Sequence, residues 1–156
     1  MNQQRLMVLA VVVSGLTGVA LAGQETEPVY GPTNPSPTLQ GKAQVQRYAS
    51  VIELNVEKEQ EYRRLHAAVW PKVVAALKRA NIRNYSIYVA ELHGKTYLFS
   101  YFEYTGSDPR TDLAKIGQDP TVKNEWWPLT EACQRRLPGT PEGEQWKSLE
   151  MLMLIE

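Results

Sequence analysis

The chain has 156 residues, of which 43% are hydrophobic and 22% are charged, and these are ordinary proportions for a single globular domain. Its 17 Lys and Arg residues balance 17 Asp and Glu residues, which argues against a nucleic-acid-binding protein because such proteins need an excess of basic residues. One Cys and two His make a poor zinc site, and the sequence has neither a GxGxxG motif nor a P-loop. We therefore expect no metal and no cofactor.

The first 22 residues have the three regions of an export signal. Arg5 is followed by an apolar run over residues 6–13, and Ala20-Leu21-Ala22 fits an A-x-A cleavage rule. A membrane anchor is the alternative, but the apolar core is short and small polar residues interrupt it at 14–15 and 17–18. We predict that residues 1–22 are a cleaved signal peptide, which leaves an exported chain with no membrane attachment in the periplasm or outside the cell.

Residues 23–46 are rich in Pro, Gly, Thr, Ser and Gln and have few apolar side chains. Such a composition offers little burial to offset the entropy of ordering, and it is typical of a flexible or extended linker. We expect the folded domain to span residues 47–156.

The domain begins with a strand-like segment over residues 47–54. Asn55 is a good N-cap for a helix over residues 57–66, in which acidic residues precede basic ones as the helix dipole favours. Pro71 interrupts this helix and suits the first position of the next one, which we expect over residues 71–80.

A hairpin is expected next. Residues 84–91 alternate like a strand, His93-Gly94 has the composition of a turn, and residues 95–104 form an aromatic third strand. The position of His93 in this turn indicates a solvated residue rather than a catalytic one.

The remaining chain predicts two helices and a strand. The helices are expected over residues 108–117 and 119–136, with a kink or break at Pro128, and the strand over residues 147–156. The order β-α-β-β-α-β predicts an α+β fold of ferredoxin-like topology.

Strands two to four carry large apolar groups on both faces, such as Ile87 against Tyr88 and Phe99 against Phe102. Helices cover only one face of such a sheet, and a large exposed apolar patch needs a partner. We therefore expect a homodimer in which two sheets pack face to face, giving a dimeric α/β barrel.

His66 is the leading candidate for acid–base chemistry. Tyr62 lies four residues before it, which places both on one helix face, and Tyr85 and the pair Trp126-Trp127 follow in later elements. Together these residues suggest a pocket for a polyhydroxy ligand, in which phenols bind hydroxyls and indoles stack on the ring. An ordinary aromatic core around a buried His explains the same pattern.

The order of several short motifs resembles the L-rhamnose mutarotase family over residue 47 to the end. These motifs are Glu61-Tyr62-x-x-x-His66, Val69-Trp70-Pro71, Asn84 to Tyr88, Leu98 to Tyr104, Asp119-Pro120, Trp126-Trp127 and Leu149-Glu150. The resemblance implies a small dimeric α/β barrel that interconverts the α and β anomers of L-rhamnose without a cofactor. It also implies that His66 is the proton donor and that Tyr62, Tyr85, Trp126 and Trp127 bind the monosaccharide substrate.

Two other functions stay open. One is an exported sugar-binding module that has the pocket but no turnover. The other is a dimeric α/β-barrel enzyme of another class, such as a cofactor-free monooxygenase, which explains the fold but not the combination of Tyr62, His66 and Trp126-Trp127. The rate of anomer exchange distinguishes the mutarotase from the binding module.

Overall fold

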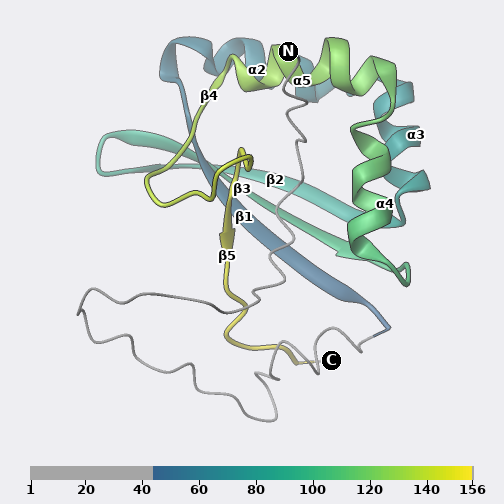
Figure 1. The fold of residues 1–156 in the computed structure, drawn as a ribbon. Coiled ribbons are helices and arrows are strands. Elements are labelled where there is room, and N and C mark those ends of the chain that lie inside the picture. The colour runs from purple at the N-terminus through teal and green to yellow at the C-terminus, as the bar shows by residue number, and fades with distance from the viewer. Residues whose placement is uncertain (1–43, 156) are drawn as a thin grey trace.

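The computed structural model describes residues 44–155, and Figure 1 shows helices gathered along one side of an antiparallel sheet. Residues 1–43 and 156 lie outside the described residues, and with them the predicted signal peptide and nearly all of the predicted linker. The first strand begins at Gln46, one residue earlier than expected.

The sheet has five strands, and its main path runs β2-β3-β1-β4 with every pairing antiparallel. The strands are β1 (Gln46–Leu54), β2 (Ile82–Leu92), β3 (Lys95–Tyr104), β4 (Gln134–Arg135) and β5 (Lys147–Leu149). β4 and β5 pair with different parts of β1. Because β1 and β2 flank β3, the topology is the expected ferredoxin-like one, and the fold is α+β.

The helical elements form two groups, one after β1 and the other after β3. The helical elements are η1 (Val56–Lys58), α2 (Glu59–Ala67), α3 (Pro71–Arg79), α4 (Pro109–Ile116), η2 (Val122–Trp126) and α5 (Trp127–Glu131). Asn55 caps the first of them through a hydrogen bond from the Glu57 backbone N–H, and Pro71 is the first residue of α3, as the sequence predicts.

The covered face of the sheet carries the core. In the β1–β3 register, Ile52 lies opposite Leu98 and Tyr48 opposite Phe102, so each pair shares a face. Ile52, Leu98 and Phe102 are buried against the helices, as are Val73 of α3 and other helical side chains. Pairs of this kind fix the register of a sheet, because a slip by one residue would turn every core side chain outward.

The opposite face of the sheet is apolar but exposed. Tyr88 pairs with Phe99 on this face, and the Tyr88 side chain is 62% exposed. Leu149 of β5 is 42% exposed, and the residues that follow it include Leu152 and Ile155, whose side chains are 70% and 75% exposed. The helices thus leave a large apolar surface of the chain open.

Two predicted boundaries at the C-terminal end are wrong. The predicted strand over residues 147–156 pairs only at Lys147–Leu149, because the apolar residues beyond it have no neighbouring strand among residues 44–155. The predicted helix over residues 119–136 ends at Glu131, and β4 follows instead. There the Cys133 carbonyl accepts a hydrogen bond from the Asn55 backbone N–H, so pairing with the end of β1 overrides local helix propensity.

Pro128 widens the helix that contains it rather than ending it. The proline has no N–H to donate, and its ring clashes with the carbonyl of the preceding turn. The preceding segment, η2, is a π-helical turn in which the Trp127 backbone N–H bonds to the Val122 carbonyl, five residues back. The helix then continues as α5.

A buried polar cluster holds α4 against the sheet and the turn between α3 and β2. The Asp112 Oδ2 accepts hydrogen bonds from the Tyr104 hydroxyl at 2.7 Å and the Asn81 amide at 2.8 Å, and its Oδ1 lies 2.6 Å from the Lys115 Nζ. Lys115 first, then the Tyr104 and Asn81 donors, lower the pKa of Asp112 to about 2. A Cβ at Gly106 would clash with the Tyr104 hydroxyl, so the cluster requires glycine there.

Candidate functional site

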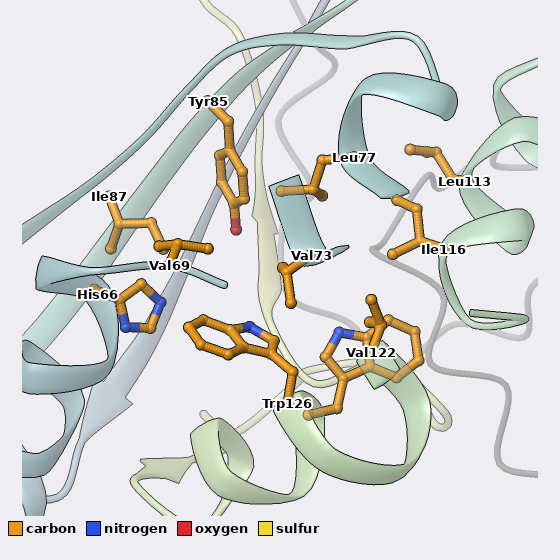
Figure 2. Close-up of a pocket in the computed structure, with 11 residues that line it drawn as sticks. His66, Val69, Val73, Leu77, Tyr85, Ile87, Leu113, Ile116, Val122 and Trp126 are labelled. Atoms are coloured by element: carbon orange, nitrogen blue, oxygen red, sulfur yellow. The ribbon is translucent and has the colours of Figure 1, made fainter. Parts of the chain in front are cut away.

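A cavity of about 290 Å³ lies between the covered face of the sheet and the helices (Figure 2). Its lining residues come from α2, α3, α4, η2, α5, β2 and the segment between α2 and α3. They are His66, Val69, Val73, Leu77, Tyr85, Ile87, Leu113, Ile116, Val122, Trp126 and Trp127. The wall is therefore mainly apolar, with a few polar atoms from His66, Tyr85 and the indoles, which is the usual makeup of a small-molecule site.

Two contacts with Tyr62 orient the His66 ring. The His66 Nδ1 lies 3.0 Å from the Tyr62 carbonyl oxygen, and the two rings stack with centroids 4.0 Å apart. Because a carbonyl oxygen only accepts hydrogen bonds, Nδ1 is the donor, and the lone pair of the neutral ring is then on Nε2. Figure 2 shows a ring nitrogen of His66 facing the cavity between Tyr85 and Trp126.

Burial keeps His66 neutral. Desolvation lowers its pKa below the ordinary value, and the hydrogen bond to the Tyr62 carbonyl only partly offsets this effect. At neutral pH the ring is therefore a proton acceptor at the nitrogen that faces the cavity. After it has accepted a proton, it can return it to a ligand.

Tyr85 brings a hydroxyl into the same cavity from β2. Its ring packs edge-on against Phe102, with centroids 5.9 Å apart, and its oxygen points toward Trp126 in Figure 2. Burial raises the pKa of Tyr85 to about 12. At neutral pH the phenol of the resting site is therefore protonated and can donate a hydrogen bond to a ligand oxygen.

Both indoles of the tryptophan pair line the cavity. Trp126 is buried and lies between His66, at a centroid distance of 5.3 Å, and Trp70, at 5.2 Å. Trp127 is half-buried, and its ring packs over Gly117, where a Cβ would lie 3.0 Å from the Trp127 Cη2. The π-helical turn thus delivers two adjacent rings to one cavity.

Tyr62 is separated from the other candidate residues. Its ring lies behind the imidazole of His66 and lines a second cavity of about 280 Å³, which His66 and Ile87 also line. Burial raises the pKa of the Tyr62 phenol well above its ordinary value. The structure brings His66, Tyr85, Trp126 and Trp127 together at the main cavity and puts Tyr62 beside them, on the other side of the catalytic candidate.

The apolar wall of the cavity was not predicted from the sequence. Val69, Val73 and Leu77 recur at intervals of four residues and line one side of the main cavity, while Ile116 and Val122 line another. The spacing of the first three is typical of one helix face and so predicts core residues, although Val69 itself lies before the start of α3. These side chains line a cavity instead of a filled core because the residues opposite them leave a space.

Within the part of the chain that the structure describes, no cluster of three or more His, Cys, Asp or Glu residues could hold a metal ion. No helix of residues 44–155 is long and apolar enough to cross a membrane. His93 lies exposed in the hairpin turn, away from the cavity residues, as the sequence predicts.

Comparison with known proteins identifies the family. The L-rhamnose mutarotase family model matches residues 47–153. This chain belongs to the L-rhamnose mutarotase family. The L-rhamnose mutarotase of Sinorhizobium fredii is 35% identical over 62% of this chain and 88% of its own, and that of Lactiplantibacillus plantarum is 31% identical over 62% and 90%. Membership makes the chain an isomerase that acts on sugar anomers and sets aside the monooxygenase alternative.

The fold comparison agrees with the family. The crystal structure of an L-rhamnose mutarotase from Formosa agariphila superposes on this mutarotase-family chain with a TM-score of 0.52 and 22% identity. The match covers 71% of this chain and 99% of the other. At that identity the likeness shows the shared fold.

Proposed function

We propose that this chain interconverts the α and β anomers of L-rhamnose, or of a related 6-deoxyhexose, by acid–base ring opening without a cofactor. One observation carries the proposal. The Nδ1 of His66 bonds to a backbone carbonyl, which leaves its other nitrogen free for a ligand in a cavity shared with a phenol and two indoles. Mutarotation needs one group that moves protons at neutral pH, and a neutral imidazole suits that task.

The reaction follows from this arrangement. The free nitrogen of His66 takes the proton of the anomeric hydroxyl, the C1–O1 bond becomes a carbonyl, and the bond from C1 to the ring oxygen breaks. The ring oxygen gains a proton from Tyr85 or from a water that Tyr85 orients. Rotation of the open aldehyde and reversal of both transfers close the ring on the other carbonyl face. His66, expected from the resemblance to be the proton donor, thus accepts first and donates on closure.

The apolar wall supports a deoxy sugar as the substrate. Val73, Leu77, Ile116 and Val122 offer no hydrogen-bonding side chain to a 6-hydroxyl, whereas a methyl group gains from their burial. The indoles suit the C–H face of a pyranose. The relatives named L-rhamnose mutarotase add the specific sugar to this chemistry.

Saturation-transfer NMR tests the proposal. One irradiates the α H1 resonance of L-rhamnose and follows the β H1 resonance with and without protein, then repeats the experiment with L-fucose, L-mannose and D-glucose. L-Mannose is the matched control because it adds only the 6-hydroxyl to L-rhamnose. Accelerated exchange that is fastest for L-rhamnose supports the proposal. Saturable binding without faster exchange would favour the alternative, a sugar-binding module.

We also propose that the chain forms a homodimer through the apolar face of the sheet. Tyr88, Leu149 and the exposed residues after β5 support it, because a patch of this size is rarely left open to water. Sedimentation of the chain from Gly23 onward at micromolar concentration should report twice the chain mass. Tyr88→Glu tests whether this face of the sheet is the dimer interface, and it should give a monomer that keeps its secondary structure.

Export remains a proposal as well. Arg5, the apolar run over residues 6–13 and Ala20-Leu21-Ala22 support cleavage before Gly23. The substrate would then be met outside the cytoplasm. N-terminal sequencing of protein from the native host should begin at Gly23, and an intact Met1 on cytoplasmic protein would contradict this proposal.

A further inference from the structure

Asn84 has an unusual backbone conformation for a residue inside a strand. Among the described residues, the non-glycine residues with positive φ are Asn81, Asn84 and His93, at 59°, 49° and 52°. Asn81 precedes β2 and His93 is in the hairpin turn, where such values are common. Asn84 is the third residue of β2. A left-handed residue within a strand marks a place where the ladder is interrupted.

The strand register shows what the interruption does. Before it, Arg83 of β2 pairs with Glu103 of β3, and after it, Ser86 pairs with Tyr101. Two residues of β2 therefore lie between these pairs, against one residue of β3. This is the two-against-one arrangement of a β-bulge.

Because of the bulge, β2 places one side chain in the core and another in the wall of the cavity. Ile82 is 3% exposed and belongs to the core under the helices, and Tyr85 lines the cavity on that same covered side. They are three residues apart, and in an uninterrupted strand residues three apart point to opposite faces. The extra residue, Asn84, removes this conflict.

A side-chain contact fastens the bulge to the neighbouring strand. The Asn84 Nδ2 donates to the Glu103 Oε2 at 2.7 Å, and the Tyr101 hydroxyl donates to the Glu103 Oε1 at 3.1 Å. Both oxygens of one carboxylate are thus engaged on β3. Asparagine meets both needs, because it tolerates left-handed backbone better than most residues and carries an amide donor.

We propose that Asn84 is a positioning residue that aims the Tyr85 hydroxyl into the sugar cavity. It touches no ligand itself and acts through the bulge and its hold on Glu103. The kinetic part of this inference rests on the proposed function, because the hydroxyl matters for turnover only if Tyr85 works on the ring oxygen.

Two alanine variants separate an effect on the orientation of the Tyr85 hydroxyl from an effect on stability. Asn84→Ala and His93→Ala both force alanine into left-handed backbone, but only the first lies next to Tyr85. We expect similar losses of melting temperature from both. Only Asn84→Ala should lower kcat for anomer exchange, by roughly ten- to hundredfold, the size that a misplaced catalytic group produces. KM should change less than kcat, and Asn84→Gly, which restores the backbone conformation without strain, should recover most of the lost rate.

An independent readout keeps this inference separate from the proposed function. With ¹³C-labelled tyrosine and Tyr85→Phe to assign the signal, the ring resonance of Tyr85 should move in Asn84→Ala and stay in place in His93→Ala. That result is expected even if no sugar turns over. If the alanine variant does not fold, Asn84→Asp keeps the left-handed preference but loses the amide donor to Glu103, and it should also move the Tyr85 resonance. An unmoved Tyr85 resonance in folded Asn84→Ala, or equal kcat in both alanine variants, would overturn the proposal.

Discussion

Asp112 of α4 and His66 of α2 differ in how completely their polar atoms are paired. The Asp112 carboxylate accepts from Tyr104 and Asn81 and pairs with Lys115. His66 has a partner for Nδ1, but among the described residues none for the nitrogen that faces the cavity. A fully paired cluster holds elements together, whereas a half-paired one retains capacity for a ligand.

The difference also appears in the pKa shifts. Hydrogen bonds dominate at Asp112 and favour its charged form, while burial dominates at His66 and favours its neutral form. The first shift stabilises a fixed ion in the fold. The second makes a base that is ready at neutral pH. The first four of the five predictions that follow test whether these assignments to structure and to chemistry are right.

The largest effect is expected from His66→Asn. Exchange of L-rhamnose anomers should fall by roughly two to four powers of ten, the usual worth of a positioned acid–base group, with a smaller change in sugar affinity. His93→Asn is the matched control, because it removes the other His of the chain from an exposed turn whose left-handed backbone asparagine tolerates. Near-wild-type exchange in folded His66→Asn would remove the catalytic assignment and turn attention to the tyrosines.

Asp112→Asn should show the reverse pattern. We expect the free energy of unfolding to fall by about 2 kcal/mol, since hydrogen bonds to a charged group contribute about that much, while exchange per folded molecule changes little. Denaturant titration and NMR on one preparation measure both quantities. A loss of turnover as large as that of His66→Asn would contradict the assignment of Asp112 to the stability of the fold.

The same carboxylate predicts part of the acid sensitivity of the fold. Its pKa of about 2 in the folded state lies below the ordinary unfolded value of about 3.9, so its stabilisation is complete above that value and is lost as the pH falls toward 2. Stability curves of wild type and Asp112→Asn should therefore converge with falling pH over this interval. Parallel curves would contradict the assignment.

The pH dependence of turnover tests the assignment of His66 as the base. His66 works as a base, and its pKa lies below the ordinary value of about 6.5. We expect kcat/KM to stay level from about pH 8 to 6.5 and then to fall about tenfold per unit below the lowered pKa, as the imidazole becomes protonated. A decline that begins above pH 7 would mean that burial does not govern this group.

The smallest effect is expected at the edge of the cavity. Gly117→Ala would place a Cβ 3.0 Å from the Trp127 ring, so the ring must shift by a few tenths of an ångström. The backbone of Gly117 is helical, so alanine itself causes no strain. We expect KM for L-rhamnose to change about two- to threefold at nearly constant kcat. Ala114→Gly in the last turn of α4, for which Gly117 is the C-cap, is a control for the change in backbone propensity.

Local signals in the sequence predicted much of the fold. Pro71 at the start of a helix, the His93-Gly94 turn and the Asn55 cap each depend on a few adjacent residues, and each is confirmed. The contact between Tyr62 and His66 is also local, since one helix turn separates them. These features follow from rules that need no knowledge of distant partners.

The predictions that needed distant partners were less successful. The apolar run after Leu149 fits a strand, but a strand also needs a neighbour with free backbone groups, and the sequence does not say where that neighbour is. The main cavity depends on a β-bulge that the alternation of residues along the strand does not predict. The apolar wall of the cavity has the spacing of an ordinary core. A space left between core residues is a property of their packing in three dimensions.

The π-helical turn over Val122–Trp126 has a consequence for how the site can change. A helix makes such a turn when it absorbs one surplus residue without moving its ends. Deletion of a single codon in this segment would therefore restore an ordinary helix while the segments on either side keep their places. A one-residue alignment gap at this segment is thus compatible with the same placement of α5 and Trp127 in two relatives.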